Sequence, residues 1–356
     1  MYLDVYSPDF ERVAVIEVIN SLSWTTRMQA PGEISMEVPF TPATNAALAI
    51  GNFLLQKGGT EAMFISYREL STNDEGYDVI RIQGSTVLQA LAQRVALEGQ
   101  NYSTVTPLQV VRWVIEDNAT DPDNTYRKFP HLALSSEEMT QETIEAYEIS
   151  AGTDILSIVT DVMSQYDMGC RCITDISNET HTMRFFQPVN HTSNSDHPCI
   201  FSVEYDTLGA QNFIESLDTY KSVVLTHRDD GYETWIGEET GAGFNRFETY
   251  ITVASDISMA GMGALARTEL GNCLPEMTFS GDIAEHHSPL VYRVDYRVGD
   301  RVTCRYTRWG VEMDETLTEI TETWSQDNSY KIEGVFGRGT PTLSQRFNAA
   351  ISIRRR

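Results

Sequence analysis

The residues best suited to metal chemistry are three neighbours, Glu285, His286 and His287. Carboxylate oxygens and imidazole nitrogens are ligands that zinc prefers in proteins. Adjacent side chains of an extended segment point to opposite sides, so His286 and His287 would not bind the same ion. We therefore expect a solvated loop here and no metal site.

A short acidic run, from Asp121 to Thr125, resembles the beginning of a calcium-binding loop. Such a loop needs glycine at its sixth position and glutamate at its twelfth, and this run is followed by neither. We therefore do not expect calcium to bind there.

The five cysteines stand at positions 170, 172, 199, 273 and 304. Cys170 and Cys172 flank one arginine on a predicted strand, so their side chains share a face. A zinc site would need further ligands at regular spacing, but there is no second pair of this kind, and His181 and His191 lie at irregular distances. We expect reduced, partly buried thiols in a cytosolic product.

No pattern of a catalytic or cofactor-binding centre stands out. The glycines at 237, 241 and 243 lack the lysine and hydroxyl residue that follow in a phosphate-binding loop, and they predict a mobile loop instead. The motifs G-x-S-x-G and H-E-x-x-H are both missing. With 51 acidic residues, carboxylate pairs suited to glycoside hydrolysis occur anywhere and indicate nothing. The sequence favours a protein that is not an enzyme and needs no cofactor.

The elements that surround these residues are mainly β-strands, most clearly over residues 295–337. A turn at Gly299-Asp300 precedes one stretch of alternating apolar and polar residues, and residues 317–324 form another. Residues 327–329 then supply the turn chemistry of a hairpin. Alternation with period two is typical of an antiparallel sheet that buries one face and exposes the other to water.

The chain repeats this pattern near its N-terminus. Gly51-Asn52 corresponds to Gly299-Asp300 once a few extra residues are allowed in the later hairpin loop. Laid without gaps on the later segment, the earlier one places Tyr67 on Ile320, Glu69 on Glu322, Asp74 on Asp327 and Tyr77 on Tyr330. Hairpins resemble one another by chance, but agreement in residue type as well as period favours a true duplication. The two glycine-led pairs are our candidates for assembly residues.

This duplication predicts an α+β fold that is mainly antiparallel β, with two similar β-barrel-like modules and an α+β domain inserted between them. The predicted segments are a first module over 1–104, the insert over 105–200, a second module over 201–337 with a helix near 258–271, and a basic tail over 338–356. Helix starts are indicated by Thr106 with Pro107, by Thr153-Asp154 and by Ser258.

The formal net charge of −25 argues against a general nucleic-acid binder, which needs a basic surface. The charge either serves solubility or gives a surface past which DNA slides without adhering, because like charges repel within about 8 Å. Arg354, Arg355 and Arg356 at the C-terminus contrast with this charge. They either dock on an acidic neighbour or on DNA, or form a frayed, solvated end. No apolar run approaches the ~20 residues that span a bilayer, and the N-terminus is unlike a secretory signal.

The order of these features resembles the tail-tip (baseplate) hub family of siphophages, which is related in fold to the hub of contractile-tail baseplates. The similar segments run over most of residues 20–337 and in the family's order. They include APGEISMEVPF, GNFLLQKGGTEAMFISYRE, DVIRIQGSTVLQALAQR, YRKFPHLAL, TDILSIVTDVMSQYDMG, FSVEYDTLGAQNFIESLDTYKSVV, YRVDYRVGDRVT and LTEITETW.

The resemblance implies a homotrimer in which each chain gives two similar modules, so that six modules alternate around a ring. Its implied partners are the distal tail protein or tail-tube ring, the tape measure protein, and a tip fiber or receptor-binding protein. DNA would pass through the central channel without specific binding. The implied location is the virion tail tip, assembled in the host bacterial cytoplasm.

Some relatives carry a lytic or host-binding extension after the hub, and we expect none here. A fiber or enzyme would then be a separate protein, anchored through Arg354, Arg355 and Arg356. Two other functions remain open: a carbohydrate- or receptor-binding adhesin, with aromatic side chains clustered on one sheet face, and a cell-wall hydrolase. The sequence singles out no carboxylate pair for the hydrolase, and its aromatic residues lie mostly within alternating strands, where core packing is expected.

Overall fold

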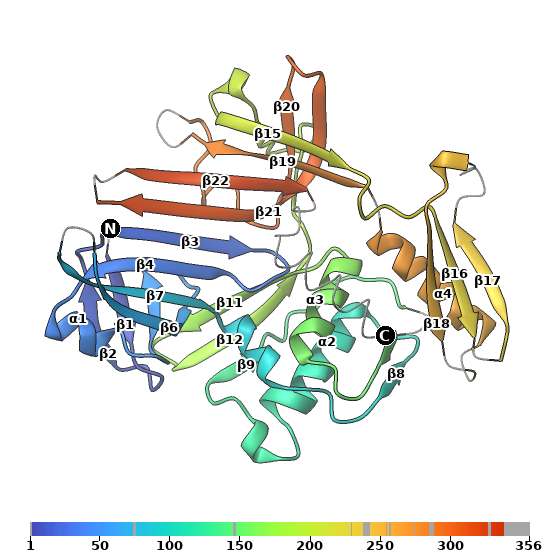
Figure 1. Ribbon diagram of the computed structural model, residues 1–356, viewed down its shortest axis with the longest axis horizontal. Coiled ribbons are helices and arrows are strands. Elements are labelled where there is room, and N and C mark those ends of the chain that lie inside the picture. The colour runs from blue at the N-terminus through green and yellow to red at the C-terminus, as the bar shows by residue number, and fades with distance from the viewer. Residues whose placement is uncertain are drawn as a thin grey trace.

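One sheet of 14 strands organises the molecule (Figure 1). The computed structural model describes residues 2–73, 76–144, 147–228, 230–237, 243–253, 255, 258–273, 275–284, 288–326 and 329–337. No helix of this described part is long and apolar enough to cross a membrane.

The first half of the sheet is built from the N-terminal residues, and every pair of neighbouring strands is antiparallel. The strands lie in the order β3 (Ser21–Arg27), β4 (Glu33–Pro39), β7 (Asp78–Thr86), β6 (Met63–Thr72), β5 (Phe53–Gln56), β1 (Leu3–Tyr6) and β2 (Arg12–Ile16). A short helix, α1 (Pro42–Ala47), connects β4 to β5.

The second half comes from the C-terminal residues and is also antiparallel at its centre. Its strands are β15 (Leu208–Ser216), β19 (Glu276–Ile283), β22 (Tyr330–Gly337), β21 (Val311–Ser325) and β20 (Arg301–Tyr306). Two short strands, β13 (Asn190–His191) and β14 (Ile200–Phe201), pair in parallel with β20.

The two halves have the same strand order. The series β3-β4-β7-β6-β5 matches β15-β19-β22-β21-β20, both in sequence order and in spatial order. This agreement supports the duplication that the sequence predicted. The barrel-like shape is incomplete: within the described residues the path of the sheet stays open, with β15 at one end and β2 at the other.

Each half buries its own apolar cluster, the first around Trp24 and the second around Phe336. Each cluster is also contacted by a side chain from the other half of the sheet. Met28, which follows β3, belongs to the second cluster, and Trp324 of β21 packs against the first. The halves are therefore fixed to one another by packing as well as by strand pairing.

Below the sheet lie two helices and a small sheet (Figure 1). The helices are α2 (Pro107–Ile115) and α3 (Ile155–Gln165). The small sheet consists of β11 (Gly169–Asp175), β12 (Thr180–Phe186) and β9 (Leu132–Leu134). Two further strands, β8 (Gln100–Tyr102) and β10 (Tyr147–Ile149), pair with one another. The predicted helix starts are confirmed. Thr106 Oγ1 accepts a hydrogen bond from Gln109 N at 3.3 Å, and Asp154 Oδ1 accepts one from Ser157 N at 2.8 Å.

The predicted strand of Cys170 and Cys172 is confirmed as β11, which forms an antiparallel hairpin with β12. Cys170 and Cys172 of β11 are both buried, as expected for one face of a strand, and all five cysteines are free thiols. The parallel addition of β9 was not predicted, because nothing local in a three-residue strand specifies a distant partner.

A separate lobe stands at the right of Figure 1 and interrupts the second half between β15 and β19. It contains β16 (Val223–Arg228), β17 (Glu233–Gly237) and β18 (Glu248–Val253), with β16 in the middle, and the helix α4 (Met259–Asn272). Ser258 caps α4 as predicted, with Oγ accepting from Gly261 N at 3.1 Å. In the first half a short hairpin between β3 and β4 takes the place of this lobe.

Candidate functional site

The clearest sign of the duplication is one hydrogen-bond pattern that occurs twice. Gly51 N donates to Ile65 O at 2.9 Å, and Ile65 N donates to Asn52 O at 2.9 Å. In the second half Gly299 N donates to Leu317 O at 2.8 Å, and Leu317 N donates to Asp300 O at 2.9 Å. The correspondence of Gly51-Asn52 with Gly299-Asp300, read from the sequence, is therefore present in the structure.

Both glycines need a left-handed backbone, with φ of 92° at Gly51 and 97° at Gly299, which side chains disfavour. The residues that follow them are anchored inside the fold. Asn52 Nδ2 donates to Ala47 O at 2.8 Å, and Asp300 Oδ2 accepts from Arg297 N at 2.7 Å. Burial raises the pKa of Asp300. These four residues shape the start of β5 and of β20, and their role in assembly stays a prediction.

A β-bulge follows the pattern in each half, between Ile65 and Tyr67 in β6 and between Leu317 and Glu319 in β21. The bulges make Tyr67 equivalent to Glu319, whereas the ungapped alignment placed Tyr67 on Ile320. That alignment is wrong by one residue, because it matched turn residues and not the strand pairing. A slip of one residue exchanges the two faces of a strand, so the correction decides which side chains are equivalent.

The halves meet where the C-terminal part of β21 pairs with β3, from Glu319 opposite Arg27 to Ser325 opposite Ser21. Arg27 Nε donates to Glu319 Oε2 at 2.6 Å. The hydroxyls of Thr25 and Thr321 lie 3.0 Å apart. Side chains directly opposite one another in an antiparallel pair stabilise the sheet, so this seam is specific as well as continuous.

A buried carboxylate joins the halves beside the seam. Glu322 is 3% exposed, and its Oε2 accepts from Arg293 Nη2 at 2.6 Å. Arg293 Nη2 also donates to Gln56 Oε1 of the first half at 2.7 Å. Tyr330 OH donates to the other oxygen of Glu322 at 2.7 Å. Burial lowers the pKa of Arg293, but the combined interactions with Glu322, Tyr292 and Tyr330 outweigh this effect, and the pKa is raised.

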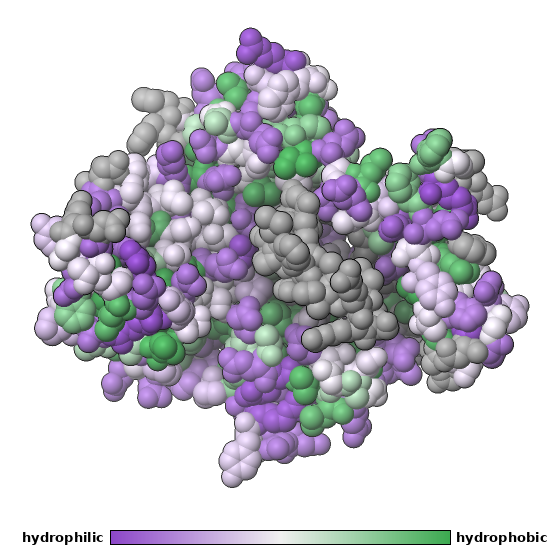
Figure 2. All heavy atoms as spheres, in the orientation of Figure 1, coloured by the Kyte–Doolittle hydropathy of each residue, from purple (hydrophilic) through white to green (hydrophobic). Residues whose placement is uncertain are grey.

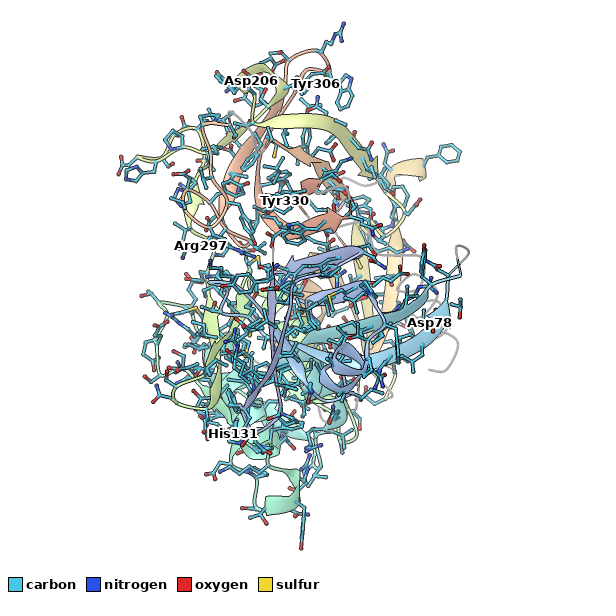
Figure 3. The ribbon with its side chains drawn as sticks, turned by 90° about the vertical axis from the view of Figure 1, so that its left-hand side faces the viewer. Asp78, His131, Asp206, Arg297, Tyr306 and Tyr330 are labelled. Carbon is cyan, nitrogen blue, oxygen red and sulfur yellow. The ribbon has the colours of Figure 1, made fainter. Side chains whose placement is uncertain are left out.

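A cavity of about 370 Å³ opens next to this network and is lined by Arg171, Arg184, Arg293, Arg297 and Glu61, among others. Four arginines around one cavity stand out in a chain with 26 basic and 51 acidic residues, and two of them are paired, Arg184 with Glu137 and Arg293 with Glu322. Arg297 and Tyr330 lie at the level where the upper and lower parts of the molecule meet in Figure 3. Burial raises the pKa of Glu61, although Arg171 and Arg293 oppose the shift. The arrangement suits an anionic group of a neighbouring molecule.

Arg354, Arg355, Arg356 and the run Glu285-His286-His287 lie outside the described residues. Within the part of the chain that is described, no three His, Cys, Asp or Glu side chains are placed to hold a metal ion.

Sequence reasoning missed Arg293, Glu322 and Gln56. Arg293 lies in a connection without periodicity and adopts φ of 67°, which no local pattern signals. The alternation of residues 317–324 places Glu322 on the same face of its strand as Ile320, and the structure agrees, since both side chains are buried. The pairing of Glu322 with residues from two other segments is a property of the folded chain, which the alternation does not show.

Comparison with known proteins places these features in a family. The family model described as "Siphovirus ReqiPepy6 Gp37-like protein" matches residues 2–338. No curated protein sequence matches the chain.

Solved structures of phage tail proteins share the fold. A tail protein from Neisseria meningitidis MC58 is similar with a TM-score of 0.61 and 12% identity, over 95% of this chain and 96% of that one. The 43 kDa tail protein of prophage MuSo2 from Shewanella oneidensis gives 0.62 and 12%, over 95% and 98%. Prophage tail protein gp18 from Listeria monocytogenes EGD-e gives 0.58 and 10%, over 99% and 100%.

The resemblance to siphophage tail proteins that the sequence indicated is thus confirmed at the level of family and fold. The match runs through both halves of the sheet and the elements between them. The chain belongs to the Siphovirus ReqiPepy6 Gp37-like family of phage tail proteins.

Proposed function

We propose that the chain is the structural hub of a siphophage tail tip and that three copies form a ring. Each copy contributes two repeat units, so six similar units surround a central channel. Such a ring joins the sixfold tail tube or distal tail ring to a threefold tip. The observation that carries the proposal is the repeated five-strand order, β3-β4-β7-β6-β5 and β15-β19-β22-β21-β20, with its shared glycine-led turn.

The proposed partners follow from this place in the tail. One face of the ring contacts the distal tail protein or tube ring, and the other contacts a tip fiber or receptor-binding protein. The channel holds the end of the tape measure protein before DNA passes through it. The net charge of −25 supports passage of DNA without retention. Figure 2 shows hydrophilic and hydrophobic residues interspersed over the face of the molecule that it presents.

We also propose that the chain is not an enzyme and that it acts in the virion tail tip after assembly in the host cytoplasm. A structural role needs rigid, repeated surfaces and no turnover, and the two cores with their buried seam provide them. The matching test is incubation of the purified chain with peptidoglycan. Release of soluble fragments above the level of a heat-denatured sample would contradict the structural role.

The oligomeric state tests the hub directly. Native mass spectrometry of the purified chain is expected to give an assembly of three times the 40.1 kDa chain mass. Electron microscopy of that assembly should show six similar densities around one axis. A monomer at every concentration, also with the distal tail protein added, would refute the hub.

One other function has a specific observation in its favour. The lobe exposes three aromatic side chains, Tyr232, Phe244 and Tyr250, and Tyr250 stacks on His227 with ring centres 6.0 Å apart. Exposed rings of this kind bind the apolar faces of sugars, as a carbohydrate-binding adhesin requires. Binding of host cell-wall glycans that is lost in Tyr250→Ala, with the trimer intact, would support this function.

A further inference from the structure

Strand β21 uses a single edge for two partners in succession. Residues 311–316 of that edge pair with β20, and residues 319–325 pair with β3 of the first half. The change of partner occurs at the bulge between Leu317 and Glu319. The bulge therefore ends the contact inside one repeat unit and begins the contact with the next unit.

The equivalent strand β6 makes only the first of these contacts. Phe64 and Met63 pair with β5, the bulge follows at Ile65, and among the described residues no strand pairs with that edge of residues 67–72. Strand β15, which is equivalent to β3, pairs with β19 and with no other strand of the described part of the chain. Within the described residues each chain thus has two unpaired strand edges, one along residues 67–72 of β6 and one along β15. These edges are equivalent to the two strands that pair in the internal seam, β21 and β3.

We propose that residues 67–72 of β6 pair antiparallel with β15 of a second copy, in the register that β21 and β3 use within one chain. The equivalence places Tyr67 opposite Ser216, Arg68 opposite Glu215, and Leu70 opposite Phe213. The inference rests on the proposed ring and names the surfaces that close it. A head-to-tail contact between two different edges generates a ring when its rotation closes, as it does after three copies in a threefold assembly.

Charge supports the register. Arg68 Nη2 donates to Asn45 Oδ1, while its Nε is buried and has no hydrogen-bond partner among the residues that the structure describes. Glu215 is exposed, and neither residue has an ion-pair partner within the described part of the chain. Pairing of the copies would put the carboxylate of Glu215 beside this guanidinium, as Glu319 lies beside Arg27 in the internal seam.

Apolar exposure supports the same contact. Leu70 is 54% exposed and Tyr67 is 46% exposed on an edge that has neither proline nor lysine to block it. Proteins usually protect a free strand edge, because it can pair with another chain. In the proposed pairing Leu70 lies opposite Phe213. The equivalent pair in the internal seam is Glu322 opposite Trp24, and the side chains of Glu322 and Trp24 are both buried.

The partner must be another copy and not the same chain. Six strands separate β6 from β15 in the sheet, namely β7, β4, β3, β21, β22 and β19. At about 4.8 Å per strand the two edges are far beyond hydrogen-bond distance in one molecule. Figure 3 agrees: Asp78, across the hairpin from the end of β6, and Asp206, just before β15, lie in different parts of the molecule.

Engineered disulfides test the register. Ser71→Cys with Asn212→Cys, and Thr72→Cys with Gln211→Cys, place cysteines directly opposite one another in the proposed pairing. Ser71→Cys with Ser216→Cys is the matched control, since its positions are four residues out of register, or about 13 Å apart. After oxidation, non-reducing electrophoresis should show covalent dimer and trimer for at least one in-register pair, and monomer for the control.

The outcomes separate this inference from the hub itself. A trimer in native mass spectrometry without a cross-link for either in-register pair overturns the β6–β15 contact and leaves the hub standing. A cross-link that forms equally in the control overturns the register. A chain that stays monomeric in all variants overturns both.

A charge exchange gives a second, independent test. Arg68→Glu should raise the dissociation constant of the trimer at least tenfold, and Arg68→Glu with Glu215→Arg should restore most of the affinity. Arg305→Glu, on the β20–β21 hairpin, is the control that should leave assembly unchanged. Thermal unfolding of the monomeric fraction verifies that each variant folds. An Arg68→Glu trimer as stable as the wild type would contradict the contact.

Discussion

At the scale of single residues, Glu322 is the polar group on which the joint between the halves depends. Its carboxylate is almost fully buried and accepts hydrogen bonds from Arg293 and Tyr330. A buried charge persists only when it is paired, since the loss of water must be offset. The seam thus contains a contact that is costly to break by removal of one partner.

Glu322→Ala should lower the free energy of unfolding by about 2 kcal/mol. Removal of one partner of a fully buried pair costs about 3–5 kcal/mol, but Arg293 is 42% exposed and regains water. Urea unfolding measures the change. Glu312→Ala, which removes the exposed pair with Arg305 at 2.7 Å, should cost only about 0.5 kcal/mol. Equal losses for both variants would show that the seam carries no special stability.

His181 makes the stability depend on pH. It is buried against Phe10, Phe53 and Phe64, and its Nδ1 lies 2.9 Å from Thr174 Oγ1. Burial lowers its pKa from 6.5 to about 4. The unfolded chain therefore binds a proton between these values and the folded chain does not, so stability falls as the pH drops below about 6.5.

From pH 7 to pH 5 this histidine should remove about 2 kcal/mol of stability. Denaturant unfolding at the two pH values measures the loss, and His181→Gln should remove that part of the slope. A His181→Gln protein with the wild-type pH dependence would show that other groups cause it.

At the scale of elements, the glycine-led turns before β5 and β20 are equivalent in backbone and different in surroundings. Among the described residues, a Cβ on Gly51 would meet nothing within 4 Å, whereas one on Gly299 would lie 2.3 Å from the ring of Phe186. Gly51→Ala should therefore cost about 1–2 kcal/mol for the positive φ alone. Gly299→Ala should cost about 1–3 kcal/mol more through overpacking.

Urea unfolding of the two alanine variants measures this difference, and Gly310→Ala is a suitable control. Gly310 also has a positive φ of 68° with open space around it, so it should behave like Gly51. A Gly299→Ala variant as stable as Gly51→Ala would mean that Phe186 moves aside at little cost.

The elements also show what the sequence could and could not predict. The helix starts at Thr106, Asp154 and Ser258 could be predicted because a cap is a local interaction between a side chain and the first turn of the helix. The glycine-led pairs identified the duplication because a left-handed turn restricts residue type. The sequence alignment of β6 with its equivalent strand β21 was wrong by one residue, because strand pairing and bulges are set by the neighbouring strands. The β21–β3 seam and its buried Glu322 join segments almost 300 residues apart, and no local pattern specifies such a contact.

At the scale of the whole molecule, the lobe is an insertion into a repeat that is otherwise complete without it. The first half closes the same position with a hairpin between β3 and β4. The lobe buries its own side chains, among them Val224 and Met262, and none of these belongs to the four main apolar clusters. The lobe therefore adds a surface to the molecule, and although α4 lies against α3, the lobe adds no side chain to these clusters.

A chain in which residues 217–275 are replaced by a copy of the Met28–Gly32 connection should keep the main unfolding transition. Its two cores, its seam and the β15–β19 pairing lose no buried partner, because the lobe contributes none to them. Circular dichroism with urea unfolding measures the transition, and native mass spectrometry shows whether the ring still forms. The control deletes α3, whose Ile155, Ile158 and Val159 belong to a main cluster, and should abolish cooperative unfolding. Loss of the main transition without the lobe would show that the second half needs its insertion to fold, and that the two repeat units are less equivalent than their strand order implies.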